Sequence, residues 1–206
     1  VGFTACDSFL DEDPKSSLTL DTYYKTSADI IGNVNYLYRD GAPDKMGNMT
    51  GAYRGSSLSV MNMVTGYFVN EYEGQEVDCS YARQLTRQDF TQSCCNYLTN
   101  DTWKSCYKSI NVANAVIKYV DGVEMDNQAQ YKAEARFFRA LNYFYLVKMF
   151  GDVPMVTEPT EDATLVEYPT RTAASEVFNT VIIPDLQFAV ENLPNATFAG
   201  NSHRVT

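Results

Sequence analysis

Residues 133–154 read AEARFFRALNYFYLVKMFGDVP, and this stretch decides the fold. Apolar residues recur in it every three or four positions along two faces, which predicts a helix buried on two sides. The helix is expected to begin near Asp126. Gly151 and Pro154 predict a sharp end, because glycine suits the position after a helix and proline cannot continue one.

Aromatic residues are abundant, with 15 Tyr, 11 Phe and 1 Trp among 206 residues. Most of them follow helical periods, so we interpret them as packing between antiparallel helices. This group includes Trp103, Tyr107, Phe137, Phe138, Phe144 and Tyr145.

Other segments also predict helices, while residues 70–96 show no sustained period and are expected to form an ordered loop region. A helix from Asn100 or Asp101 is expected to end at Asp121-Gly122, with the glycine in a left-handed conformation. The other expected helices cover 27–39, 53–69 and 172–193, the last kinked at Pro184. The chain thus predicts an all-α fold, with a lead-in at 1–22 and one helical domain at 23–206.

Composition excludes several classes of function. The 16 Lys+Arg against 26 Asp+Glu give a net charge of −10, which argues against nucleic-acid binding. His203 is the single histidine, so zinc sites that need several histidines are excluded and a Ser-His-Asp triad is improbable. The sequence has no Gly-rich phosphate loop and no metal-ligand spacing. We therefore expect no cofactor, no metal site and no catalytic activity.

The cysteines fall into two groups. Cys6 follows the short run VGFTA and precedes an acidic segment, as in the end of a bacterial lipoprotein signal, so Cys6 is the expected lipidation site. No stretch approaches the length of a transmembrane helix. The other cysteines are interpreted as buried thiols, with one or two disulfides as the alternative in an exported protein: Cys79, Cys94, Cys95 and Cys106.

A minority of aromatics lies outside the helical periods, around the 70–96 loop region. Flat apolar faces together with planar polar side chains suit ligand binding, and loops on a rigid scaffold are where function concentrates. We therefore predict a ligand site from aromatic Tyr67, Phe68, Tyr72 and Tyr81 with polar Asp78, Arg83 and Gln84. The alternative is that these tyrosines belong to the core or contact a partner protein.

The charged residues inside the deciding stretch are a separate question. Glu134, Arg136 and Arg139 lie on a helix expected to be buried on two sides, and buried charges must be paired. We interpret them as internal struts between helices, not as ligand-binding groups. Trp103 lies on an apolar stripe and is likewise expected in the core.

Several motifs together resemble the SusD/RagB family of surface lipoproteins. Residues 133–154 are similar to its signature, and residues 6–11 (CDSFLD) are similar to its lipidated start. The helix before the signature is matched by Trp103, Tyr107, Ile110, Asn111, Ala113 and Asn114. The segment after it is matched by 169–171 (PTR) and 183–186 (IPDL).

The resemblance implies tetratricopeptide-like antiparallel helix pairs that form a superhelical scaffold. It implies a protein anchored by lipid at Cys6 on the outer face of the outer membrane, without enzymatic activity. Such a protein captures oligosaccharides for a SusC-like TonB-dependent transporter. The alternatives are a member that captures peptides, or a helical interaction scaffold without a small ligand. Family members are usually more than twice this long, so we expect the chain to be an N-terminal portion.

Overall fold

The computed structural model describes residues 19–39, 62–68, 84, 86–89, 93–160, 169–197 and 200–206. Two-residue strands β1 (Val153–Pro154) and β2 (Arg171–Thr172) pair antiparallel in this part of the chain. The remaining regular elements are helical: α1 (Leu20–Tyr23), α2 (Ser27–Arg39), α5 (Ser93–Tyr119), η2 (Val120–Gly122), α6 (Gln128–Phe150), α7 (Ala174–Val177), η4 (Phe178–Ile182) and α8 (Ile183–Asn192). The prediction of an all-α fold is confirmed.

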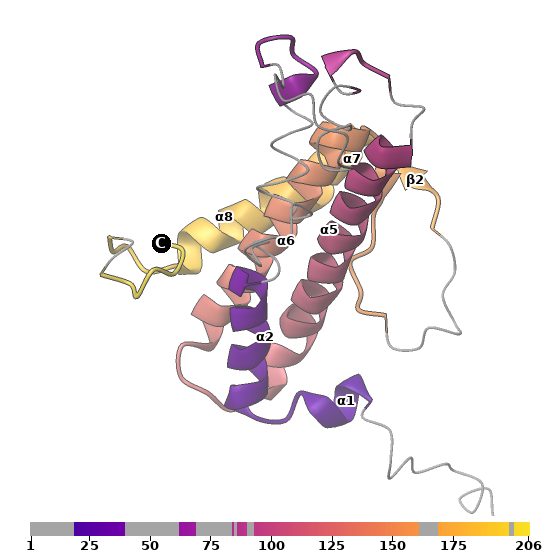
Figure 1. Cartoon of the computed structure of the whole chain (residues 1–206). Coiled ribbons are helices and arrows are strands. Elements are labelled where there is room, and N and C mark those ends of the chain that lie inside the picture. Colours follow the sequence, from indigo (N-terminus) through magenta and orange to yellow (C-terminus); the bar gives the residue numbers. More distant parts are fainter. Residues whose placement is uncertain are drawn as a thin grey trace, which may run out of the picture.

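Helix α6 is the centre of the arrangement. It runs antiparallel beside α5, while α8 packs along its other side and α2 contacts both α5 and α6 (Figure 1). Two buried clusters result. One joins α2, α5 and the first half of α6, and the other joins α5 and the second half of α6 to α7 and η4. The predicted burial of α6 on two sides is therefore confirmed.

The buried arc of α6 differs in detail from the predicted stripes. Tyr143 and Leu146 are fully buried, although neither was in the predicted packing set. Phe144 is 39% exposed, so it packs at the edge of the core and not inside it. Adjacent helical residues point about 100° apart, so when Tyr143 faces the core Phe144 lies at the margin. There it makes edge contacts with Tyr145 and Phe178.

Residues in left-handed or other positive-φ conformations flank α6 and determine where it begins and ends. Asn127 precedes it with φ 56° and ψ 30°, a left-handed conformation that asparagine tolerates. Gly151 follows it with φ 69°, and the Gly151 amide donates to the Val147 carbonyl oxygen at 2.9 Å. The predicted glycine stop is thus confirmed, and positive φ explains the need for glycine.

Helix α5 begins and ends differently from the prediction. It begins at Ser93, inside the expected loop region, because no glycine or proline interrupts residues 93–101 and a helix propagates easily once formed. It ends in the 3₁₀ turn η2, and Gly122 is not in the left-handed region. The side-chain amide of Gln128 donates to the carbonyl oxygens of Val120 and Val123, at 2.7 and 3.0 Å. These bonds satisfy two carbonyl groups where the chain leaves the helix and has no regular backbone partner to offer them.

Two other helix predictions need correction. The expected helix 172–193 begins at Ala174, because Arg171 and Thr172 form β2. The π-helical turn η4 precedes Pro184, which lies in the first turn of α8, where its missing N–H costs least. Of the expected helix 53–69, only 62–68 is described, and within it the helix ends at Met63 and a turn follows.

Candidate functional site

The aromatic residues of the predicted ligand site that the structure describes, Tyr67 and Phe68, lie on a turn at residues 62–68. Gly66 has φ 78°, which lets the chain reverse. Thr65 fixes the turn: its hydroxyl donates to the Asn62 carbonyl oxygen at 2.6 Å and accepts from the Tyr67 amide at 3.3 Å. The Gln88 side-chain amide donates to the Val64 carbonyl oxygen at 3.3 Å and links the turn to residues 86–89.

The turn presents two adjacent aromatic side chains to solvent. Tyr67 is 89% exposed and Phe68 is 57% exposed. Exposure on this scale gives up most of the roughly 1.5–3 kcal/mol that burial of such a ring contributes. These rings are therefore not part of the core that the described residues form, and flat apolar faces on a constrained turn are suited to a ligand or partner.

Among the other predicted ligand residues, Gln84 is described: it is half-buried, and its carbonyl oxygen accepts from the Asp89 amide at 2.9 Å. Tyr72, Asp78, Tyr81 and Arg83 lie outside the described residues. Their grouping with Tyr67 remains a prediction. Cys6, the expected lipidation site, and Cys79 also lie outside the described residues. Cys94 and Cys95 lie in α5, but the structure does not describe their side chains. Cys106 is a buried free thiol whose pKa is raised to about 12 by burial, as expected for a structural cysteine.

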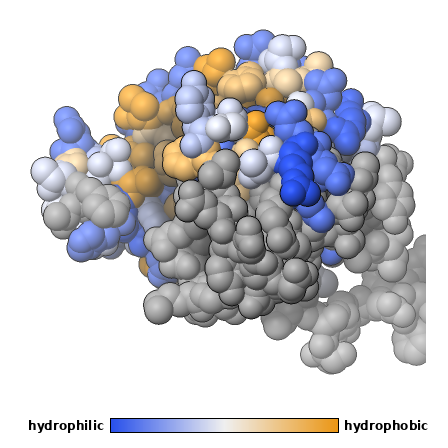
Figure 2. Space-filling model, turned by 45° about the horizontal axis from the view of Figure 1, so that its top comes forward, coloured by the Kyte–Doolittle hydropathy of each residue, from blue (hydrophilic) through white to orange (hydrophobic). Residues whose placement is uncertain are grey.

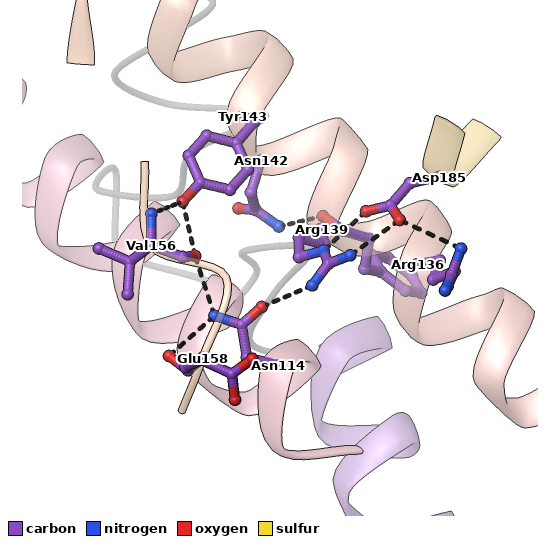
Figure 3. Close-up of polar contacts among 9 residues, drawn as sticks. Asn114, Arg136, Arg139, Asn142, Tyr143, Val156, Glu158 and Asp185 are labelled. Atoms are coloured by element: carbon purple, nitrogen blue, oxygen red, sulfur yellow. Dashed lines mark hydrogen bonds and ion pairs between the residues drawn. The ribbon is translucent and has the colours of Figure 1, made fainter. Parts of the chain in front are cut away.

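The charged residues of the deciding stretch form the internal ion pairs that were predicted. Asp185 on α8, 2% exposed, accepts two hydrogen bonds from Arg139, from Nε at 2.6 Å and from a terminal nitrogen at 2.9 Å (Figure 3). Arg136 lies 3.8 Å from the same carboxylate and its guanidinium covers the Phe188 ring. The predicted role of Arg136 and Arg139 as struts between helices is confirmed.

The same network holds the chain that leaves β1. Arg139 also donates to the Asn114 side-chain oxygen at 2.9 Å, and the Asn114 amide donates to the carbonyl oxygens of Val156 and Glu158 (Figure 3). The Tyr143 hydroxyl donates to the Val156 carbonyl oxygen at 2.8 Å and accepts from its amide at 2.7 Å. Burial raises the pKa of Tyr143 to about 12, so the hydroxyl keeps its proton and both bonds.

Glu134 pairs with a residue from the end of the described chain. Its carboxylate is fully buried, and both of its oxygens accept from Arg204, with Nε at 3.0 Å from each. The Arg204 guanidinium also lies over the rings of Tyr38 and Tyr131. The prediction that Glu134 is an internal strut is confirmed.

Three of these partners were missed by sequence reasoning. Asn114, Asp185 and Arg204 lie 25, 46 and 70 residues from their partners in α6. A single sequence offers no signal for pairing at such separations. The surplus of charge in a helix buried on two sides was the only available indication that partners exist.

Trp103 packs as predicted but lies at the end of the core. Its ring is half-buried, with the Phe150 ring at 5.1 Å and the Tyr107 ring at 5.0 Å. The guanidinium of exposed Arg171 lies 5.9 Å from its centroid. Tyr107 anchors this end of the bundle by donating from its hydroxyl to the Pro154 carbonyl oxygen at 2.7 Å.

Two searches of the described residues limit other kinds of site. No group of three or more His, Cys, Asp or Glu side chains is placed to hold a metal ion there. Within the same ranges, no helix has both the length and the apolar character needed to cross a membrane.

Comparison with known proteins gives consistent results. The family model described as "Starch-binding associating with outer membrane", SusD-like, matches residues 8–206. The "SusD-like protein P2" of Formosa agariphila is 27% identical over 194 residues, which cover 93% of this chain and 36% of that protein. The chain thus spans about a third of the length of the relatives it matches.

Solved structures share the fold. A "Laminarin binding SusD-like protein" superposes with a TM-score of 0.68 at 24% identity, over 89% of this chain and 38% of that one. A complex "with xylogluco-oligosaccharide" gives 0.58 at 22% identity, over 82% and 30%. With a family model that matches nearly every residue and relatives aligned over more than nine-tenths of its length, the chain belongs to the SusD-like family.

Proposed function

We propose that the full-length protein captures oligosaccharides at the bacterial surface, and that Tyr67 and Phe68 form part of the ligand site. The observation behind the proposal is the pair of exposed rings on a turn held by Thr65 and Gln88, in a chain of the SusD-like family. Sugar rings present C–H faces that stack on aromatic side chains. A turn with a fixed backbone presents those rings with little loss of conformational entropy on binding.

The relatives favour a glycan over a peptide. One neighbouring structure is named for laminarin binding and another holds a xylogluco-oligosaccharide. The family description likewise names starch. Peptide capture is therefore the outcome that the binding experiment has to exclude.

The proposed setting is the outer membrane. The family description associates its members with that membrane. A lipid on Cys6 would anchor the protein facing the exterior, where it delivers oligosaccharides to a SusC-like TonB-dependent transporter. Mass spectrometry of the native protein should find acyl chains on Cys6, and the transporter should co-purify from solubilised outer membranes. An unlipidated mature protein that still carries residues 1–5 would contradict the anchor.

A ligand panel tests the binding function. Full-length protein is titrated calorimetrically with β-glucan, xyloglucan and starch oligosaccharides and with a set of mixed peptides. We expect heat from at least one oligosaccharide class, and chromatography should recover that oligosaccharide uncleaved. Binding to peptides alone, or cleavage of the sugar, would refute the proposal. For the remainder of the predicted site, Tyr72→Ala and Tyr81→Ala are each expected to weaken the binding, and unchanged affinity in both would remove them from the site.

A further inference from the structure

Residues 200–206, which follow α8 in the sequence, lie against α2 and α6 (Figure 1), and we call this segment the strap. The Arg204 amide donates to the Asn201 carbonyl oxygen at 2.9 Å, and the Asn201 side-chain amide donates to the Val205 carbonyl oxygen at 3.1 Å. The Val205 amide donates to the Tyr38 hydroxyl at 2.9 Å. The strap is therefore an internally braced segment that reaches the helices at positions 204 and 205.

The Arg204 side chain enters a cage formed by two residues of α2 and two of α6, and 21% of it is exposed. Its guanidinium carbon lies 4.9 Å from the centroid of the Tyr38 ring and 5.3 Å from that of Tyr131. Nε and one terminal nitrogen donate to the fully buried carboxylate of Glu134. The other terminal nitrogen donates to the Asn35 side-chain oxygen at 2.9 Å. We call these four residues the arginine cage.

The geometry of the arginine cage favours a guanidinium over other cations. All three guanidinium nitrogens donate to it, in directions that a planar fork provides, and the flat faces of the group suit the two rings. A lysine ammonium concentrates its donors at one point and cannot reproduce this pattern. Gln130 donates to the Glu134 carboxylate at 3.1 Å, which helps to fix its orientation. The cage is thus specific in shape as well as in charge.

Backbone strain in the strap opposes its closed position. Ser202 has φ 51° and His203 has φ 63°, so two consecutive residues other than glycine are left-handed. This conformation is unfavourable for L-amino acids and persists only where surrounding contacts hold it. Arg204 follows directly, and its ion pair with Glu134 is placed to hold the turn.

Burial of apolar surface contributes little to the closed strap. Val205 is its single large apolar residue and is only half-buried. Figure 2 shows apolar side chains that remain at the surface of the molecule, and Val190 near the end of α8 is 83% exposed. The strap therefore depends mainly on Arg204 for its attachment.

We propose that the strap is a releasable latch, and that the arginine cage is a guanidinium-binding site which Arg204 fills within the same chain. Binding in the cage favours the closed strap, while the left-handed turn at Ser202 and His203 favours release. An open strap leaves Glu134 without its counter-ion and the cage available to another guanidinium. The proposal does not rest on the proposed saccharide-binding function.

Hydrogen–deuterium exchange of the full-length protein, followed by mass spectrometry, tests the latch. Arg204→Lys keeps the positive charge but not the planar fork. We expect the amides of residues 200–206 to exchange about tenfold faster or more in this variant, because charge-assisted hydrogen bonds are lost, while exchange in α8 stays unchanged. Ser202→Gly should slow exchange in the strap, because glycine adopts the left-handed conformation without strain. Asn195→Gly, at an exposed residue where φ is not positive, is the matched control and should not slow it.

Chemical complementation tests the guanidinium site. Ethylguanidinium is the part of the side chain that Arg204→Ala removes. At millimolar concentration it should raise the midpoint of urea unfolding of this variant in a saturable manner, or restore the circular dichroism of a variant that does not fold without it. Ethylammonium at the same ionic strength should have no such effect. Arg171→Ala, at an exposed arginine that donates to the Asp152 carbonyl oxygen, is the control and should not respond to ethylguanidinium.

Four results would each overturn the proposal. They are strap exchange in Arg204→Lys at the wild-type rate, no slowing of exchange in Ser202→Gly, an effect of ethylammonium on Arg204→Ala equal to that of ethylguanidinium, and an equal response of Arg171→Ala to ethylguanidinium.

Discussion

Asp185→Asn is the sharpest test of the helix packing. The asparagine has nearly the same shape as the aspartate but no charge. In the native protein the carboxylate of Asp185, 2% exposed, faces Arg139 at 2.6 and 2.9 Å, with Arg136 at 3.8 Å. The substitution leaves the Arg139 guanidinium, itself largely buried, without its counter-ion between α6 and α8.

The expected magnitude follows from the burial. Removing one partner of a buried ion pair costs about 3–5 kcal/mol, a large part of the 5–15 kcal/mol that typically separates folded from unfolded protein. Arg139→Met with Asp185→Leu removes the buried pair together and leaves two smaller losses. Asn114 loses its donor, which costs about 1–3 kcal/mol, and Arg136, whose side chain is 26% exposed, loses a counter-ion 3.8 Å away. The double variant should therefore be more stable than Asp185→Asn.

Urea unfolding followed by circular dichroism measures these differences as free energies of unfolding at constant m-value. Asp121→Asn is the matched control, because that carboxylate is 63% exposed in its pair with Lys132 and should cost less than about 1 kcal/mol. The reasoning is refuted if Asp185→Asn costs no more than Asp121→Asn. It is also refuted if the double variant loses as much as the sum of Arg139→Met and Asp185→Leu measured alone.

Three further changes test other parts of the fold by the same unfolding assay. Gly151→Ala should destabilise the protein by about 1–3 kcal/mol, because φ is 69° there and backbone strain, not crowding, opposes the alanine. Gly32→Ala within α2, where φ is not positive, should stabilise the protein by up to about 1 kcal/mol. A change in the free energy of unfolding with the same sign in both variants would contradict the assignment of strain to Gly151. The free energy of unfolding should fall as the pH rises from about 10 to 12, because tyrosines ionise near pH 10 in the unfolded chain while burial raises the pKa of Tyr143 to about 12. A free energy of unfolding that does not change over this range would contradict the burial of the Tyr143 hydroxyl. Arg204→Met should cost about 3–5 kcal/mol by leaving Glu134 buried without its partner, and a loss below 1 kcal/mol would show that the pair does not form.

The sequence predicted those features of the fold that depend on nearby residues. The end of α6 was predicted correctly because the left-handed Gly151 and the following proline act within a few residues. The start of α5 was missed, because residues 93–101 have no apolar period and the helix extends through them by propagation. The full burial of Tyr143 and the marginal position of Phe144 were not predicted, because periodicity indicates which residues share a face but not how that face is rotated against its neighbours.

For the candidate site and the buried ion pairs too, the sequence predicted what depends on nearby residues and missed what depends on distant ones. Tyr67 was predicted to be available to a ligand because it falls outside the helical periods, and the structure shows it exposed. The charge pairs formed by Arg139 and Glu134 were predicted in kind but not in partner, since Asp185 and Arg204 come from distant segments.

The central claim is that the exposed ring of Tyr67 contacts a bound oligosaccharide, and calorimetric titration of Tyr67→Ala tests it most directly. The ligand is the best oligosaccharide from the panel, and the control is Tyr23→Ala, at a tyrosine that is 40% exposed on α1. We predict that Tyr67→Ala raises the dissociation constant about tenfold or more, the effect of losing an aromatic anchor at a binding surface, while Tyr23→Ala leaves it unchanged. An unchanged dissociation constant in Tyr67→Ala, with the protein folded, would contradict the account.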